Sequence, residues 1–130
     1  VHNYISFEDH IIRKGAIQSY SGRKMIIPFN MRDGLAICEG KSNQDWNFSA
    51  PHGAGRVMSR SAARENVDLE EFKETMKGIY STCIGRGTLD ESPMVYKDTS
   101  EIINAISDTA EILFFVKPRI NIKAKDTTED

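Results

Sequence analysis

Glycines divide the first forty residues into short apolar runs, and this pattern constrains the fold more than any other feature of the sequence. Two such runs are residues 24–27, which end at Pro28, and residues 35–38. Short apolar runs bounded by turn residues are typical of β-strands. The simplest interpretation is an antiparallel meander. Pro28 should end a strand or occupy an edge strand, because proline lacks the N–H that a central strand donates. The glycines that separate the runs are Gly22, Gly34 and Gly40.

The pattern becomes helical in the second half of the chain. Residues 53–66 have helix-compatible spacing after a polar loop over 41–51. Asp68, followed three residues later by Glu71, predicts the start of a second helix, because this spacing forms a capping box. The apolar residues that share one face of that helix are Leu69, Phe72, Met76 and Ile79.

A third helix is predicted to begin at Asp98 or Thr99, after a loop over residues 81–95. Residues 110–122 then return to an apolar run, which we interpret as a strand or strand pair broken at Pro118. The predicted fold class is therefore α+β, with an antiparallel strand-rich N-terminal part followed by helices and a terminal strand. We expect one unit over residues 1–122 and a polar tail over 123–130.

Composition limits the classes of function. The 130 residues carry 17 basic and 19 acidic side chains, so the net charge is −2 and any nucleic-acid contact must come from a local cluster. The apolar runs are too short to cross a bilayer, and the first residues do not form a secretory signal. We expect a cytoplasmic protein with Cys38 and Cys83 as reduced thiols, a disulfide being the alternative. The absence of an initiator Met suggests a fragment or a processed product.

The segment that begins at His52 carries the clearest chemical signal. His52 is followed by Gly53, Ala54 and Gly55, small residues that let a ligand approach the backbone closely. A helix predicted to start here would add free N–H groups that suit a phosphate. An imidazole is a competent nucleophile toward phosphorus. The pattern therefore favours phosphoryl or nucleotidyl transfer, although a glycine-rich turn with a surface histidine has the same spacing.

Several cations stand near this segment in the predicted arrangement. Arg56 and Arg60 are four residues apart, so on a helix they would share a face and form a second anion site, although a solvated arginine pair is the alternative. Lys14 and Lys97 are further candidates, each with the alternative of an ordinary surface lysine. Taken together, these side chains favour a phosphate-rich ligand.

Five blocks of the sequence, taken in order, resemble the C-terminal part of the RtcB family of tRNA-splicing and RNA-repair ligases. The resemblance covers roughly residues 1 to 105, and the blocks are VHNYI, RKGAI, IPFNMRDG, SAPHGAGRVMSR and SPMVYKD. It implies an RtcB-like fold and a GTP- and manganese-dependent RNA ligase. Such an enzyme joins an RNA 3′-phosphate, or a 2′,3′-cyclic phosphate, to a 5′-hydroxyl through a covalent histidine–GMP intermediate.

The resemblance also assigns roles to individual residues. His52 would be the guanylylated histidine, Lys97 would read the guanine, and His2 would be a manganese ligand. The expected nucleotide contacts are Asn3, Pro28, Phe29, Asn30, Met31, Gly53, Ala54 and Gly55. The expected RNA phosphate contacts are Lys14, Arg56 and Arg60.

Two departures from the family pattern shape the expectation for this chain. Leu35 stands near the place of a nucleotide-contacting serine in many members. The family's other manganese ligands, an Asp, a Cys and two further His, precede the His-Asn pair that matches His2 and Asn3, and they have no counterpart in these 130 residues. We therefore expect the isolated chain to be inactive in ligation. The alternative function is a non-catalytic guanine-nucleotide or RNA-binding module that has kept the pocket.

Overall fold

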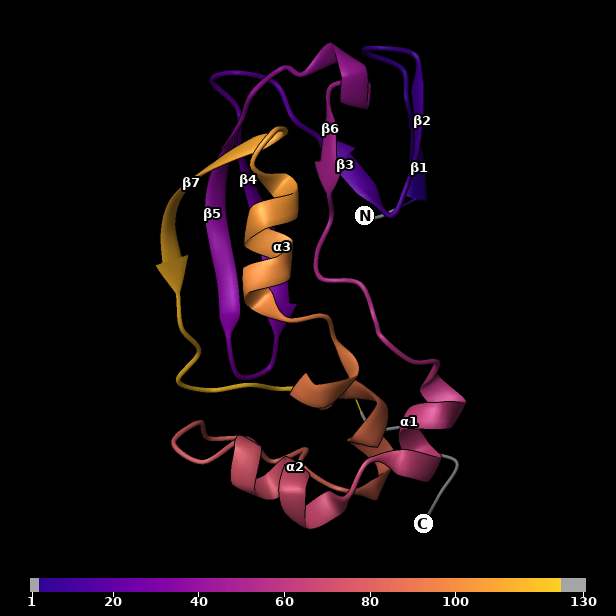
Figure 1. Cartoon of the computed structure of the whole chain (residues 1–130), viewed down its shortest axis with the longest axis vertical. Coiled ribbons are helices and arrows are strands. Elements are labelled where there is room, and N and C mark those ends of the chain that lie inside the picture. Colours follow the sequence, from indigo (N-terminus) through magenta and orange to yellow (C-terminus); the bar gives the residue numbers. More distant parts are fainter. Residues whose placement is uncertain (1–2, 125–130) are drawn as a thin grey trace. The chain divides into compact units, whose positions relative to one another are not determined.

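The computed structural model describes residues 3–124, and their contacts divide into two compact units. The first unit contains the chain up to Phe29, Leu35–Ala54 and Asp98–Val116, and the second contains Asn30–Gly34, Gly55–Lys97 and the chain from Lys117. Both strands and helices are present, with strands first and a strand after the last helix (Figure 1). The predicted α+β class is therefore confirmed.

Three small sheets make up most of the first unit. Strand β1 (Asn3–Ser6) pairs antiparallel with β2 (Ile11–Lys14), and β3 (Ala16–Gln18) pairs antiparallel with β6 (Ser49–Pro51). The third sheet has the order β4-β5-β7. Its strands are β4 (Lys24–Asn30), β5 (Gly34–Gly40) and β7 (Ala110–Val116). The predicted meander is confirmed for the β1–β2 and β4–β5 neighbours but is wrong at β3, which pairs with the distant β6. Strand β5 also pairs with β7, from the far end of the chain.

The core of the first unit lies between the three-stranded sheet and α3 (Thr99–Ile106). Burial alternates along β4, so that Met25, Ile27 and Phe29 face this core. Ile102 and Ile106 of α3 pack against them, four residues apart on one helix face. Figure 1 shows α3 running alongside β5 and in front of β4. Because β4 is an edge strand, Pro28 occupies the position that its missing N–H predicts.

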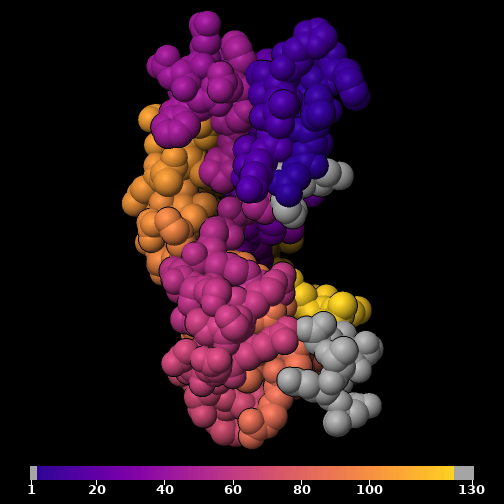
Figure 2. Space-filling model, turned by 90° about the vertical axis from the view of Figure 1, so that its right-hand side faces the viewer, coloured from indigo at the N-terminus to yellow at the C-terminus, as the bar shows by residue number. Residues whose placement is uncertain are grey.

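The β1–β2 hairpin packs against the segment around η1 (Gln44–Trp46), also in the first unit. The side chain of Arg13, only 2% exposed, donates to Ser49 Oγ at 2.8 Å and to Asp9. This bond lowers the pKa of the Asp9 carboxyl far below its usual range, although burial acts in the opposite direction. Figure 2 shows the hairpin in indigo beside the purple η1 segment.

The second unit is built from short helices around Met31, Phe72, Met76 and Leu89. Its elements are α1 (Arg60–Asn66), α2 (Leu69–Thr75) and the 3-10 helices η2 (Arg86–Glu91) and η3 (Pro93–Val95). Asp68 Oδ1 accepts the Glu71 N–H at 2.9 Å, which confirms the predicted cap of α2. The predicted helix over 53–66 begins too early, because α1 starts at Arg60. Ser59 is its N-cap and accepts the Ala62 N–H. The predicted loop over 81–95 contains η2 and η3.

Two further expectations concern the membrane and the thiols. No helix in the part of the chain that the structure describes is long and apolar enough to cross a bilayer. Cys38 and Cys83 are free thiols, as predicted, and both are buried. They lie in different units. Burial raises the pKa of the Cys38 thiol, so this group stays protonated at neutral pH.

Candidate functional site

The imidazole of His52 is oriented by the backbone of Gly15. In the antiparallel pair of β3 and β6, Ala16 lies opposite Pro51, so the neighbouring Gly15 and His52 come together. The Gly15 carbonyl oxygen lies 3.3 Å from the His52 backbone nitrogen and 2.9 Å from His52 Nδ1. A carbonyl oxygen can only accept, so Nδ1 carries the proton. The lone pair of the neutral ring is then on Nε2, so Nε2 is the ring nitrogen with nucleophilic character.

Gly15 is in turn held by Asn3. The Asn3 side-chain oxygen accepts the Gly15 N–H at 3.2 Å, and Gly15 has a φ of +64°, a conformation that favours glycine. Three of the sequence blocks are thereby linked in one chain of hydrogen bonds from Asn3 through Gly15 to His52. Asn3 is thus connected to His52 through Gly15, which bonds to both residues. Sequence reasoning did not select Gly15, because its contribution is a carbonyl oxygen, which every residue has.

The small residues after His52 lie against Pro28 of β4. Ala54 donates its N–H to the Pro28 carbonyl at 2.9 Å. A Cβ added at Gly53 would lie 3.0 Å from the Pro28 oxygen and 3.2 Å from its Cγ. A side chain at position 53 would therefore require Pro28 or the segment to shift, and the close approach that the motif predicts is made to β4 itself.

The other residues of the predicted nucleotide wall have different surroundings. Phe29 and Met31 are 3% and 1% exposed, and their side chains lie in the cores of the first and second units respectively. Asn30 is half-buried and its side chain bonds within the turn, donating to Asp33 and accepting the Arg32 N–H. Pro28 is exposed on the edge strand. Pro28 is thus the member of this set whose side chain faces solvent.

Gly55 and Lys97 come together in the second unit. The Lys97 N–H donates to the Gly55 carbonyl at 2.9 Å, and a Cβ at Gly55 would lie 3.8 Å from Lys97 Cδ. The aliphatic stem of the lysine therefore passes over the glycine. This contact joins the lysine of the YKD block to the last small residue of the HGAG block.

Arg56 precedes α1, so the expected pairing of Arg56 and Arg60 on one helix face is wrong. Arg56 instead forms an antiparallel bridge with Tyr96 and stands 4.9 Å from the centre of its ring. Its guanidinium donates to Glu91 Oε1 at 2.7 Å, to the Tyr96 hydroxyl at 3.0 Å and to the Asp90 carbonyl. Arg56 is therefore largely committed to contacts within the unit.

Arg60 reaches the same acidic residues from the first turn of α1. It forms salt bridges with Asp90 and Glu91, yet its side chain is 62% exposed. Burial raises the pKa of the Glu91 carboxyl, but Lys123, Tyr96 and Arg56 outweigh this effect and the pKa is lowered. Burial, followed by the Glu91 charge, raises the pKa of Tyr96 to about 12. The exposed Arg60 remains the better placed of the two arginines for an external anion.

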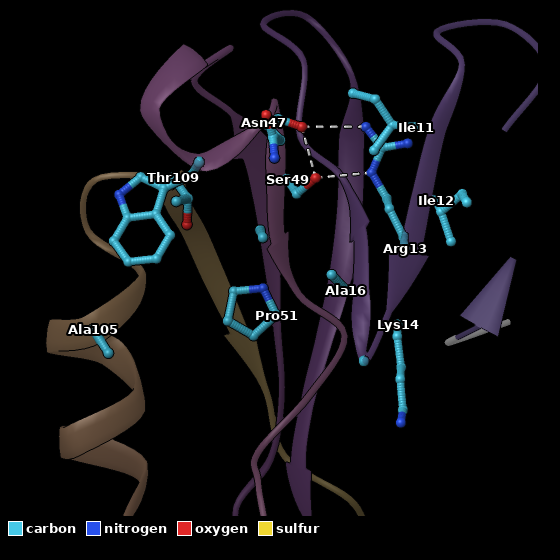
Figure 3. A pocket seen from close by; sticks show the side chains of 13 residues that line it. Ile11, Ile12, Arg13, Lys14, Ala16, Asn47, Ser49, Pro51, Ala105 and Thr109 are labelled. Atoms are coloured by element: carbon cyan, nitrogen blue, oxygen red, sulfur yellow. Dashed lines mark hydrogen bonds between the residues drawn. The ribbon is translucent and has the colours of Figure 1, made fainter. Parts of the chain in front are cut away.

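Lys14 lines a pocket of about 370 Å³ within the first unit (Figure 3). The pocket lies between β2, the η1 segment, β6 and α3, and Trp46, Pro51 and Ala105 also line it. Gly15 belongs to the same lining, so the pocket adjoins the residue that orients His52. Lys14 is exposed at the end of β2.

A metal site is not formed by the residues that the structure describes. Across residues 3–124 there is no group of three or more His, Cys, Asp or Glu side chains that could hold a metal ion. His2, the predicted manganese ligand, lies outside the described residues.

Comparison with known proteins identifies the family to which the chain belongs. The family described as "tRNA-splicing ligase RtcB" matches residues 1–124. The RNA-splicing ligase RtcB of Escherichia coli K12 is 33% identical over 128 residues, covering 94% of this chain and 31% of that protein. The tRNA-splicing ligase RtcB of Aeropyrum pernix is 37% identical over 86 residues, covering 62% of this chain and 18% of that protein. The chain thus spans about a third or less of the length of these relatives.

Proposed function

Because the chain belongs to the RtcB family of tRNA-splicing ligases, we propose that it provides the nucleotidyl-transfer centre of an RNA ligase. The proposed reaction joins an RNA 3′-phosphate or 2′,3′-cyclic phosphate to a 5′-hydroxyl, with GTP and Mn²⁺. The observation that carries the proposal is the bond between His52 Nδ1 and the Gly15 carbonyl, because it directs the ring's lone pair to Nε2.

In the first proposed step, His52 Nε2 attacks the α-phosphorus of GTP, and the bond to the bridging oxygen breaks as pyrophosphate leaves. The ring becomes positively charged when the P–N bond forms. The Gly15 carbonyl accepts the hydrogen bond from Nδ1–H throughout, and this bond strengthens as charge develops on the ring. Gly15 therefore favours the charged state over the neutral one.

In the second step, an oxygen of the RNA 3′-phosphate attacks the phosphorus of the GMP group, and the P–N bond breaks. His52 returns to its neutral form and the RNA carries an activated 3′ end. The 5′-hydroxyl then attacks the 3′-phosphorus, GMP leaves, and the hydroxyl proton passes to solvent or to a base. A cyclic phosphate must first be hydrolysed to the 3′-phosphate. Lys97, Pro28 and the backbone of residues 53–55 are the proposed nucleotide contacts.

The described residues do not form a manganese site by themselves. The roles proposed for this chain are therefore those of its own side chains and backbone. The same observation favours a second candidate function for the isolated chain. It would bind a guanine nucleotide or RNA without completing ligation. The two candidates differ in whether His52 becomes covalently labelled.

The test joins this chain to the part of the Escherichia coli relative that precedes the matched region. The chimera is incubated with Mn²⁺ and with GTP labelled on the α-phosphate. We expect an acid-labile GMP group on the peptide that contains His52, and its loss in His52→Ala. His10→Asn is the matched control, because His10 is another histidine of the first unit and asparagine tolerates its φ of 58°.

Each other outcome has a distinct meaning. A label that survives His52→Ala contradicts the assignment of the nucleophile. A chimera that binds GTP without becoming labelled supports the non-catalytic binding module instead.

A further inference from the structure

A second pocket, of about 420 Å³, lies within the second unit and is lined by four cationic side chains. They come from three separate turns, and they are Arg32, Lys77, Lys117 and Arg119. We propose that this pocket binds the phosphate backbone of a single RNA strand, at a site separate from the His52 and Lys97 residues. The proposal rests on the proposed function, because it takes RNA as the substrate.

The charge of the pocket is the first argument. The chain as a whole has a net charge of −2, yet none of the described residues that line this pocket is acidic. Arg32 and Lys77 have carboxylate neighbours in Asp33 and Glu74, but their side chains are 47% and 73% exposed. Among residues 3–124, no carboxylate forms a salt bridge with Lys117 or Arg119, and both are exposed.

This arrangement contrasts with the arginines of the HGAGR block. Arg56 and Arg60 form salt bridges with Asp90 and Glu91, whose side chains are only 4% and 16% exposed, so both arginines already have largely buried partners. In the pocket, four like charges line one concave surface, and the carboxylates that pair with two of them, Asp33 and Glu74, are not part of the lining. A phosphate chain is a ligand that removes the repulsion. Because the chain has a net negative charge, a nucleic-acid contact requires a local cluster of cations. We place that cluster at this pocket rather than at Arg56.

An exposed aromatic ring stands beside the pocket and favours RNA over other anions. Tyr80 follows Ile79, which lines the pocket, and its side chain is 66% exposed. Its backbone N–H donates to the Arg119 carbonyl at 3.0 Å, and its carbonyl accepts the Asn121 N–H at 2.9 Å. Basic grooves with neighbouring aromatic rings bind single strands, because the phosphates meet the cations while a base stacks on the ring.

The test measures fluorescence anisotropy of a short labelled single-stranded RNA with a 3′-phosphate, titrated with the chain at several salt concentrations. The double variant Lys117→Gln, Arg119→Gln is compared with Lys24→Gln, Lys73→Gln. Both doubles remove two exposed charges, but Lys24 and Lys73 do not line the pocket.

Losing two phosphate contacts lowers the slope of log K against log salt by about 1.4 and weakens binding in 0.1 M salt by about 25-fold. The Lys24, Lys73 double should bind nearly as the parent chain does. Tyr80→Ala should weaken binding by at least about fivefold while leaving the salt slope unchanged. Lys117→Arg, Arg119→Lys should restore the affinity, which excludes a folding defect as the cause.

Three results overturn the proposal. They are equal RNA affinity of the two Gln doubles, whether weakened or unchanged, no RNA binding by the parent chain, and binding of polyglutamate as tight as that of RNA. GMP labelling of His52 is measured on the same variants in the chimera. If the Lys117, Arg119 Gln double keeps the RNA affinity of the parent chain and His52 is labelled normally, the pocket proposal fails and the ligase function stands. If RNA binding depends on the pocket as proposed but His52 is not labelled, the ligase function fails and the pocket proposal stands.

Discussion

Gly53→Ala tests the contact that places the HGAG segment against β4. A methyl group at position 53 would lie 3.0 Å from the Pro28 carbonyl oxygen, tighter than nine in ten Cβ contacts in proteins. Either the segment moves and weakens the bond from the Ala54 N–H to Pro28, or the edge strand shifts. Overpacking of this kind costs about 1–3 kcal/mol. The reduced entropy of the unfolded chain returns about 0.4–1 kcal/mol.

The expected net loss in the free energy of unfolding is therefore about 1–2 kcal/mol. For 130 residues the entropy of unfolding is about 270 cal/mol/K, so Tm should fall by about 4–7 °C. Gly55→Ala is the matched control, because its Cβ would lie 3.8 Å from Lys97 Cδ in ordinary contact. Neither glycine has a left-handed φ, so backbone strain is the same in both variants. Differential scanning fluorimetry and urea titration measure the difference. A Gly53→Ala protein as stable as Gly55→Ala would refute the close approach to Pro28.

Three further predictions concern single side chains. Asp68→Ala removes the N-cap of α2 and should lower the free energy of unfolding by about 1 kcal/mol. Asp68→Asn should retain most of the stability that the cap provides, because asparagine can also accept the bond. Circular dichroism melts measure both variants, and equal losses of stability would contradict the cap. Gly15→Ala places a side chain at φ +64° and should cost about 1–2 kcal/mol and slow the labelling of His52; unchanged stability would contradict the left-handed backbone. Tyr96 keeps its proton to about pH 12 when folded but loses it near pH 10 when unfolded, so its contribution to stability is complete below pH 10 and falls between pH 10 and 12. Urea titrations at both ends of this range should show a larger fall in the parent chain than in Tyr96→Phe, and an equal fall would exclude the effect.

Local signals in the sequence predicted local structure well. Asp68 and Asp98 cap the helices that they were expected to start, because a cap depends on residues only two or three positions away. Pro28 lies on an edge strand for an equally local reason. The start of α1 was misplaced because Ser59, its actual cap, was interpreted as a position inside the helix.

Features that depend on distant residues were not predictable from patterns. The pairing of β5 with β7 joins segments whose sequences carry no mark of each other. Arg56 looked like a ligand for an external phosphate, but its partners Glu91 and Tyr96 lie 35 and 40 residues further along the chain. The orientation of His52 depends on a backbone carbonyl, which has no signature in side-chain types. The family resemblance selected His52, and the structure shows how its ring is held.

The tautomer of His52 tests the central claim most directly, because it requires neither metal nor RNA. Long-range ¹H–¹⁵N correlation spectra of the labelled chain, recorded where the ring is neutral, report which ring nitrogen is protonated. His52→Gln assigns the signals. The account predicts a protonated Nδ1 and an unprotonated Nε2, because the Gly15 carbonyl can only accept a hydrogen bond. A neutral ring protonated at Nε2 would contradict it, since the nucleophilic lone pair would then point at the Gly15 carbonyl.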